Sequence, residues 1–85
     1  MIRLTLYGRR DCELCHEMRA VVDSVLRAAP PAWQIAVDEV DVDGDPALAA
    51  AYGDDVPVLA VNGVRAFAHR VKAAALRARL TKEAR

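Results

Sequence analysis

The feature that most constrains this chain is a C-x-x-C motif at the point where its hydrophobic pattern changes period. Residues 2–7 alternate apolar and polar side chains, as the half-buried strand of a sheet does. From Cys12 to about Ala29 the apolar residues recur at helical spacing, and Pro30-Pro31 then stop the helix. The motif, Cys12-Glu13-Leu14-Cys15, is therefore predicted to open a helix that follows a strand.

Downstream of this helix, strand and helix patterns continue to alternate. Residues 34–42 are rich in Ile and Val and predict a second strand, whose acidic residues indicate either the edge of a sheet or a strand end near solvent. Asp45-Pro46 predicts the start of a short helix, with the aspartate as N-cap and the proline in the first turn, and Gly53 ends this helix. Residues 56–61 then predict a third strand.

The end of the chain predicts a hairpin followed by a helix. Asn62-Gly63 is a strong signal for a two-residue hairpin turn, and residues 64–68 are expected to return as the partner strand. An Ala-rich stretch from about residue 69 to 82 predicts the final helix. We expect strands separated by a helix to pair in parallel and the hairpin to add an antiparallel strand. The order β-α-β-α-β-β-α thus predicts an α/β fold with a mixed four-stranded sheet flanked by helices.

Length and charge narrow the classes of function. The chain of 85 residues suffices for one domain, predicted to span residues 1–85. Basic and acidic residues both total 12, which argues against general binding to nucleic acid or to anionic membranes. The N-terminal segment lacks the pattern of a secretory signal, and no apolar run is long enough to span a membrane. We therefore expect a monomer in the cytoplasm. In that reducing compartment a cysteine pair is rarely kept as a structural cross-link.

The position of the motif predicts redox chemistry. At the N-cap of a helix, the sulfur of Cys12 would face free backbone N–H groups, which stabilise a thiolate and lower the thiol pKa from about 8.5 toward neutrality. Cys15 lies one turn later on the same face, close enough to form a disulfide with Cys12. We predict that Cys12 attacks a substrate disulfide and that Cys15 then releases the product.

Charged neighbours are expected to tune this thiol. Arg9 and Arg10 would favour the thiolate of Cys12, whereas Asp11 and Glu13 would oppose it. The sequence therefore predicts a pKa for Cys12 that is lowered, but less than that of the most acidic thiols of this kind.

The segment 7–15 resembles the active-site segment of glutaredoxins, which has an aromatic residue, a basic residue three positions before the first cysteine, and a C-x-x-C that opens a helix. Val56-Pro57 is similar to a second hallmark of that family, a cis-proline preceded by a small or β-branched residue. The resemblance runs from residue 2 to about residue 64 and is strongest to short, bacterial-type glutaredoxin-like proteins.

This resemblance implies a thioredoxin fold and a groove for the substrate. Tyr7, Arg9, Val56 and Pro57 are expected to line the groove, where the backbone of the residue before the proline pairs with the substrate as an added strand would. The implied partner is a disulfide-containing protein or glutathione. No metal or organic cofactor is implied, and glutathione is a candidate electron donor.

The chain also departs from the glutaredoxin pattern. Glutaredoxins usually have Pro-Tyr between the cysteines, where this chain has Glu13-Leu14. They also carry a Gly-Gly turn followed by an acidic residue that holds the γ-glutamyl end of glutathione. Residues 64–70 contain no such turn, although Arg65 or Arg70 is a candidate for a different anion contact.

Three other interpretations of the motif remain open. Together with His16 it matches the C-x-x-C-H pattern of c-type haem attachment, which would require a mostly helical fold. The cysteines with His16 and His69 are alternatively zinc ligands. Finally, the chain is a binding module or adaptor of thioredoxin fold whose cysteines have no catalytic role.

Overall fold

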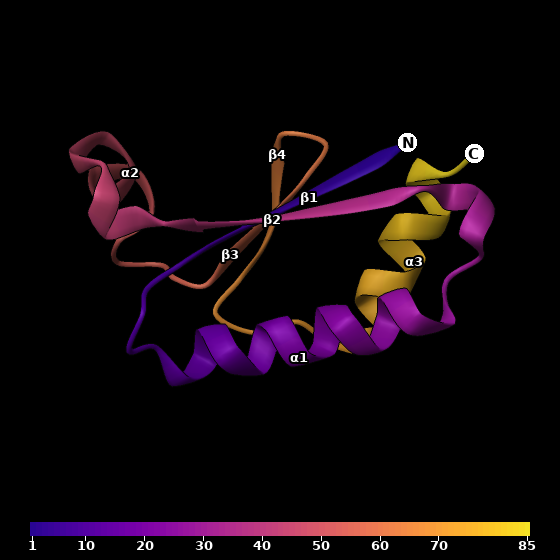
Figure 1. Cartoon of the computed structure of the whole chain (residues 1–85), viewed down its shortest axis with the longest axis horizontal. Helices are drawn as coiled ribbons and strands as arrows, with labels where there is room; N and C mark the ends of the chain where they lie inside the picture. Colours follow the sequence, from indigo (N-terminus) through magenta and orange to yellow (C-terminus); the bar gives the residue numbers. More distant parts are fainter.

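The computed structural model describes all 85 residues and has the predicted order of elements (Figure 1). Two short 3₁₀ turns, η1 and η2, flank the second strand. The elements are β1 (Ile2–Gly8), α1 (Glu13–Ala28), η1 (Pro31–Trp33), β2 (Ile35–Asp41), η2 (Val42–Gly44), α2 (Pro46–Tyr52), β3 (Val58–Val61), β4 (Val64–Ala68) and α3 (Ala73–Glu83).

The four strands form one mixed sheet in the order β2-β1-β3-β4. β1 and β2 pair in parallel across α1, as predicted, and β2 lies at the edge that its acidic residues indicated. The expectation that β2 and β3 pair in parallel is wrong, because β3 lies beside β1 and runs antiparallel to it. Their connection contains η2 and the seven-residue α2, and α2 lies beyond the end of the strands instead of crossing a face of the sheet (Figure 1).

The hydrophobic core lies between one face of the sheet and the two longer helices. The alternation predicted for β1 is confirmed, since Ile2, Leu4 and Leu6 are all buried. Leu59 and Val61 of β3 extend the same face, and α1 and α3 cover it. The helical residues of this core are Met18, Val22 and Val25 of α1 and Leu76 and Leu80 of α3. No helix of this fold combines the length and the apolar character needed to cross a membrane.

The last helix begins later than the sequence indicated, at Ala73 instead of about residue 69. His69 has a φ of 68°, a left-handed conformation that interrupts a right-handed helix. Its backbone N–H donates to the carbonyl of Pro57 at 2.7 Å, which ties the end of β4 to the residue just before β3. The residues between β4 and α3 are therefore a turn held against the start of β3.

The hairpin turn also anchors the end of α3. Asn62 and Gly63 have φ values of 50° and 82°, as the predicted turn requires. The Asn62 side chain accepts from the N–H of Arg3 and donates to the carboxylate of Glu83, each at 2.9 Å. Arg79 donates to the same carboxylate at 3.1 Å.

These contacts predict an acid-sensitive contribution to stability. The hydrogen bonds from Asn62 and Arg79 lower the pKa of Glu83 below its ordinary value of 4.5. A group whose pKa is lowered in the folded state stabilises the fold at pH values above its unfolded-state pKa. This contribution to stability is lost as the pH falls through the folded-state pKa. Glu83→Gln should therefore lower the urea midpoint at pH 7 more than at pH 3. Asp54→Asn, at an exposed carboxylate, is the control, and an equal Glu83→Gln effect at both pH values would contradict the assignment.

Candidate redox-active site

Cys12 and Cys15 form a disulfide at the start of α1, with their Cα atoms 5.2 Å apart. This separation lies within the usual range for a disulfide. Cys12 is the N-cap residue, as predicted, and its extended backbone (φ −117°, ψ 106°) presents Sγ to the first turn. The N–H of Cys15 donates to that sulfur at 3.1 Å. A free N–H at a helix start also stabilises a thiolate, so the fold provides this donor to Cys12 after reduction.

The two sulfurs have different surroundings. Cys12 is partly exposed, whereas Cys15 is only 6% exposed and packs against the end of β1. A Cβ added to Gly8 would lie 3.0 Å from Cys15 Sγ, so a larger residue here would press Cys15 away from β1. The sequence identified Gly8 only as the end of a strand, because nothing local indicates that a residue seven positions later packs on it.

The segment Val56-Pro57 lies beside this pair. Its peptide bond is cis, as the resemblance implied, and Pro57 is fully buried. Tyr7 pairs with Val58 in the antiparallel ladder. Gly8, which contacts Cys15, follows Tyr7, and Pro57 precedes Val58, so Pro57 and Cys15 lie at the same end of the sheet. Neither the N–H nor the carbonyl of Val56 makes a backbone hydrogen bond within the chain, which is a condition for pairing with an added strand.

Tyr7 contributes an aromatic surface at the end of β1. Its ring stacks on that of Tyr52 at the end of α2, with centroids 4.3 Å apart and planes 21° apart. Burial raises the pKa of Tyr7 above its ordinary value of 10.0, and Tyr52 adds to this rise. The phenol is therefore neutral at physiological pH. Tyr52 was not among the predicted site residues, and no sequence signal pairs it with Tyr7.

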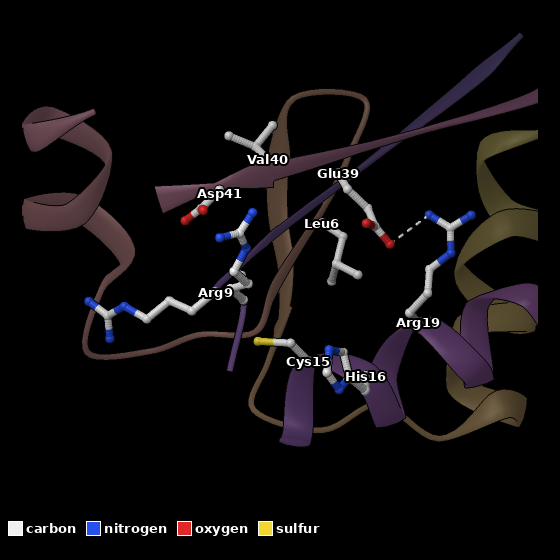
Figure 2. A pocket seen from close by; sticks show the side chains of 10 residues that line it. Leu6, Arg9, Cys15, His16, Arg19, Glu39, Val40 and Asp41 are labelled. Atoms are coloured by element: carbon white, nitrogen blue, oxygen red, sulfur yellow. Dashed lines mark hydrogen bonds and ion pairs between the residues drawn. The ribbon is translucent and has the colours of Figure 1, made fainter. Parts of the chain in front are cut away.

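Arg9 contacts α2 and η2. Its Nη1 donates to the carbonyl of Gly53 at 2.9 Å, and its Nε donates to Asp43 at 3.1 Å. Figure 2 shows a guanidinium of this loop extending toward α2. These contacts connect the β1–α1 loop to the segment that precedes Val56-Pro57. The roles assigned to Arg9 from the sequence, as a groove residue and as a neighbour of the Cys12 thiolate, remain predictions.

A polar hollow of about 360 Å³ opens beside Cys15 toward the edge strand β2. Cys15 and His16 of α1 face it together with Leu6 of β1 (Figure 2). At one end an ion pair joins Arg19 and Glu39 at 2.9 Å. His16 is exposed there, as expected for a helix residue in contact with water.

The structure bears on the haem and zinc interpretations of the motif and on the anion contact expected of Arg65. A mixed sheet flanked by helices is incompatible with the mostly helical fold that haem attachment requires. His69, a candidate zinc ligand, directs Nε2 toward Asp55 at 3.6 Å. Arg65, a candidate anion contact, also pairs with Asp55, at 3.3 Å.

The strand order, the C-x-x-C at the start of α1 and the cis-proline before β3 together define a protein of thioredoxin fold. Solved structures agree. The structural-genomics target XcR50 from X. campestris is 38% identical, with a TM-score of 0.75, over 93% of this chain and 96% of its own. Protein Ne2328 from Nitrosomonas europaea is 25% identical, with a TM-score of 0.76 and coverage of 92% and 89%. A mutant thioredoxin from Halobacterium salinarum is 25% identical, with a TM-score of 0.71 and coverage of 99% and 75%.

Residues 3–81 match the family model described as Glutaredoxin-like domain (DUF836), and the chain belongs to this family. The resemblance inferred from residues 2 to about 64 is confirmed and extends into α3. Among curated proteins, none matches the chain.

Proposed function

We propose that this protein is a thiol–disulfide oxidoreductase in which Cys12 is the nucleophile and Cys15 the resolving thiol. The observation that carries the proposal is the difference between the two sulfurs. Cys12 is accessible and accepts a backbone N–H at the start of α1, whereas Cys15 is buried against Gly8. A nucleophile needs access and a stabilised thiolate, and a resolving thiol needs only to reach its neighbour.

The reaction begins with the reduced protein. The Cys12 thiolate attacks one sulfur of the substrate disulfide, forming a mixed disulfide and expelling the other sulfur as a thiolate, which takes up a proton. Cys15 then loses its proton and attacks Cys12 Sγ, which releases the second substrate thiol and closes the Cys12–Cys15 disulfide. The substrate gains two electrons, and the protein loses them. Two molecules of a thiol such as glutathione restore the dithiol by the reverse exchange and leave joined as a disulfide.

The substrate is held beside the cysteines by backbone pairing. The free N–H and carbonyl of Val56 support this role, because an extended segment can add to them as a short strand. Tyr7, Arg9 and Pro57 would form the walls around that segment. We propose that the substrate is a disulfide-containing protein or glutathione, and that the protein acts as a cytoplasmic monomer.

Alkylation kinetics test the proposal directly. In the reduced protein at pH 7, Cys12 should react with iodoacetamide about tenfold faster than Cys15, because more of it is thiolate and it is accessible. The rate at Cys12 should rise with pH through an inflection below 8.5 but above about 5. Tryptic peptides quantified by mass spectrometry assign each rate. Equal and slow alkylation of both thiols would instead support a non-catalytic binding module.

A further inference from the structure

A second hollow, of about 480 Å³, lies between α1 and the turn that joins β4 to α3. It differs from the polar hollow beside Cys15 in having an apolar floor and a charged rim. Its floor is Leu14, Met18, Val21 and Val71, and its rim is Glu17, His69, Arg70 and Lys72. We refer to these eight residues as the α1–α3 groove.

Two residues of the groove are neighbours of the redox-active site. Leu14 stands between the two cysteines, and His69 is fixed beside Pro57 by the 2.7 Å hydrogen bond from its N–H to the Pro57 carbonyl. From Leu14 to Val21 the floor follows α1 for about 10 Å. That length matches about three residues of an extended peptide. A peptide joined to Cys12 through its cysteine can therefore pair with Val56 on one side of that cysteine and place the residues on the other side over this floor.

The rim of the groove favours anions. Glu17 is its only acidic residue, and its pairing with Arg70 is loose, at 3.9 Å, with the two side chains 58% and 77% exposed. Lys72 has no ion pair within the chain. Arg70 and Lys72 are thus free to turn toward a carboxylate, although the chain as a whole has no net charge.

We propose that the α1–α3 groove binds the segment of a protein substrate next to its reactive disulfide, and that this segment carries an apolar and an acidic residue. The inference rests on the proposed function and names the substrate class of that site. An apolar side chain would cover Leu14 and Val21, which are partly exposed, and a carboxylate would meet Arg70 and Lys72. Glutathione fits less well, because it has no apolar side chain for the floor. The rim charges would contribute chiefly to specificity and to the rate of encounter.

Matched disulfide peptides test this inference. Three peptides differ only in the three residues next to the cysteine. Leu-Glu-Glu carries both the apolar and the acidic residues, Leu-Gln-Gln lacks the acidic residues, and Gly-Glu-Glu lacks the apolar residue. The protein should reduce the first with a kcat/KM about three- to tenfold above the other two at low salt, and the advantage should shrink at about 0.5 M salt. Arg70→Gln and Lys72→Gln should lower kcat/KM for the acidic peptides only. Lys82→Gln, the same charge change ten residues further along, should have no effect.

A binding measurement separates this inference from the proposed function. A Leu-Glu-Glu peptide with serine in place of cysteine should shift the backbone amide resonances of Val21, Val71 and Lys72. Failure to reduce any disulfide would overturn the proposed function, while these shifts would still support the groove. Absence of the shifts, or equal reduction of all three peptides, would overturn the groove. A third outcome would overturn the assignment to a peptide. In it, glutathione disulfide is reduced as fast as the Leu-Glu-Glu peptide, and Arg70→Gln and Lys72→Gln lower the two rates equally.

Discussion

Cys12→Ser is expected to abolish disulfide reduction, whereas Cys15→Ala is expected to stop the reaction at the mixed disulfide. Without the sulfur of Cys12 no bond to the substrate forms. Without that of Cys15 the covalent adduct on Cys12 has no internal thiol to release it. Mass spectrometry after incubation with glutathione disulfide should find an adduct on Cys12 in the Cys15→Ala variant and none in Cys12→Ser. The expected loss in turnover of a peptide disulfide in Cys12→Ser is more than about 100-fold, since the thiolate is the attacking group.

These variants are chosen to preserve the fold. Serine is a favoured N-cap residue, so it can keep the contact that Cys12 makes with the N–H of Cys15. Alanine at the buried Cys15 avoids placing an unpaired hydroxyl in the interior. Circular dichroism should therefore match that of the parent protein. An adduct on Cys15 in Cys12→Ser, with activity retained, would reverse the assigned roles of the two cysteines.

Much of this fold is predictable because its signals are local. The period-2 alternation of β1 and the period-3.6 pattern of α1 each report which face is buried, and both elements form as predicted. Asp45 caps α2 by accepting the N–H of Ala47 at 2.8 Å, as its position before proline indicates. The cysteine motif is local in the same sense, so the site could be located from the sequence.

Most of the errors and omissions concern contacts between distant segments. The neighbours of β3 depend on how the chain returns after α2, which no local pattern encodes. The start of α3 moved because His69 bonds to Pro57, and Ala propensity alone does not reveal such a tertiary contact. Arg9 binds residues 34 and 44 positions away, where the sequence offers several equivalent acids and carbonyls. Sequence patterns thus identified the reactive atoms, and the structure adds what surrounds them.

Gly53→Ala is expected to destabilise the protein and to weaken the site, although Gly53 is outside the cysteine motif. A Cβ at this position would overlap the carbonyl of Ala49 and lie 2.8 Å from a guanidinium nitrogen of Arg9. Arg9 would have to release the Gly53 carbonyl, and the end of α2 would shift. Overpacking of this kind costs about 1–3 kcal/mol, a large part of the total stability of about 5–15 kcal/mol expected for a domain. Urea unfolding followed by circular dichroism measures the loss.

Gly44→Ala is the matched control, because a Cβ there would meet nothing within 4 Å. Its free energy of unfolding should stay within about 0.5 kcal/mol of the parent value. If the clash acts through Arg9, then Arg9→Ala should cost less in the Gly53→Ala background than alone, as expected for residues in contact. Gly53→Ala should also lower the rate of peptide disulfide reduction, because the shifted segment leads directly to Val56-Pro57. Equal stability of the two glycine variants would show that the Arg9–Gly53 contact does not hold α2 in place, and the site would then depend on β1, β3 and α1 alone.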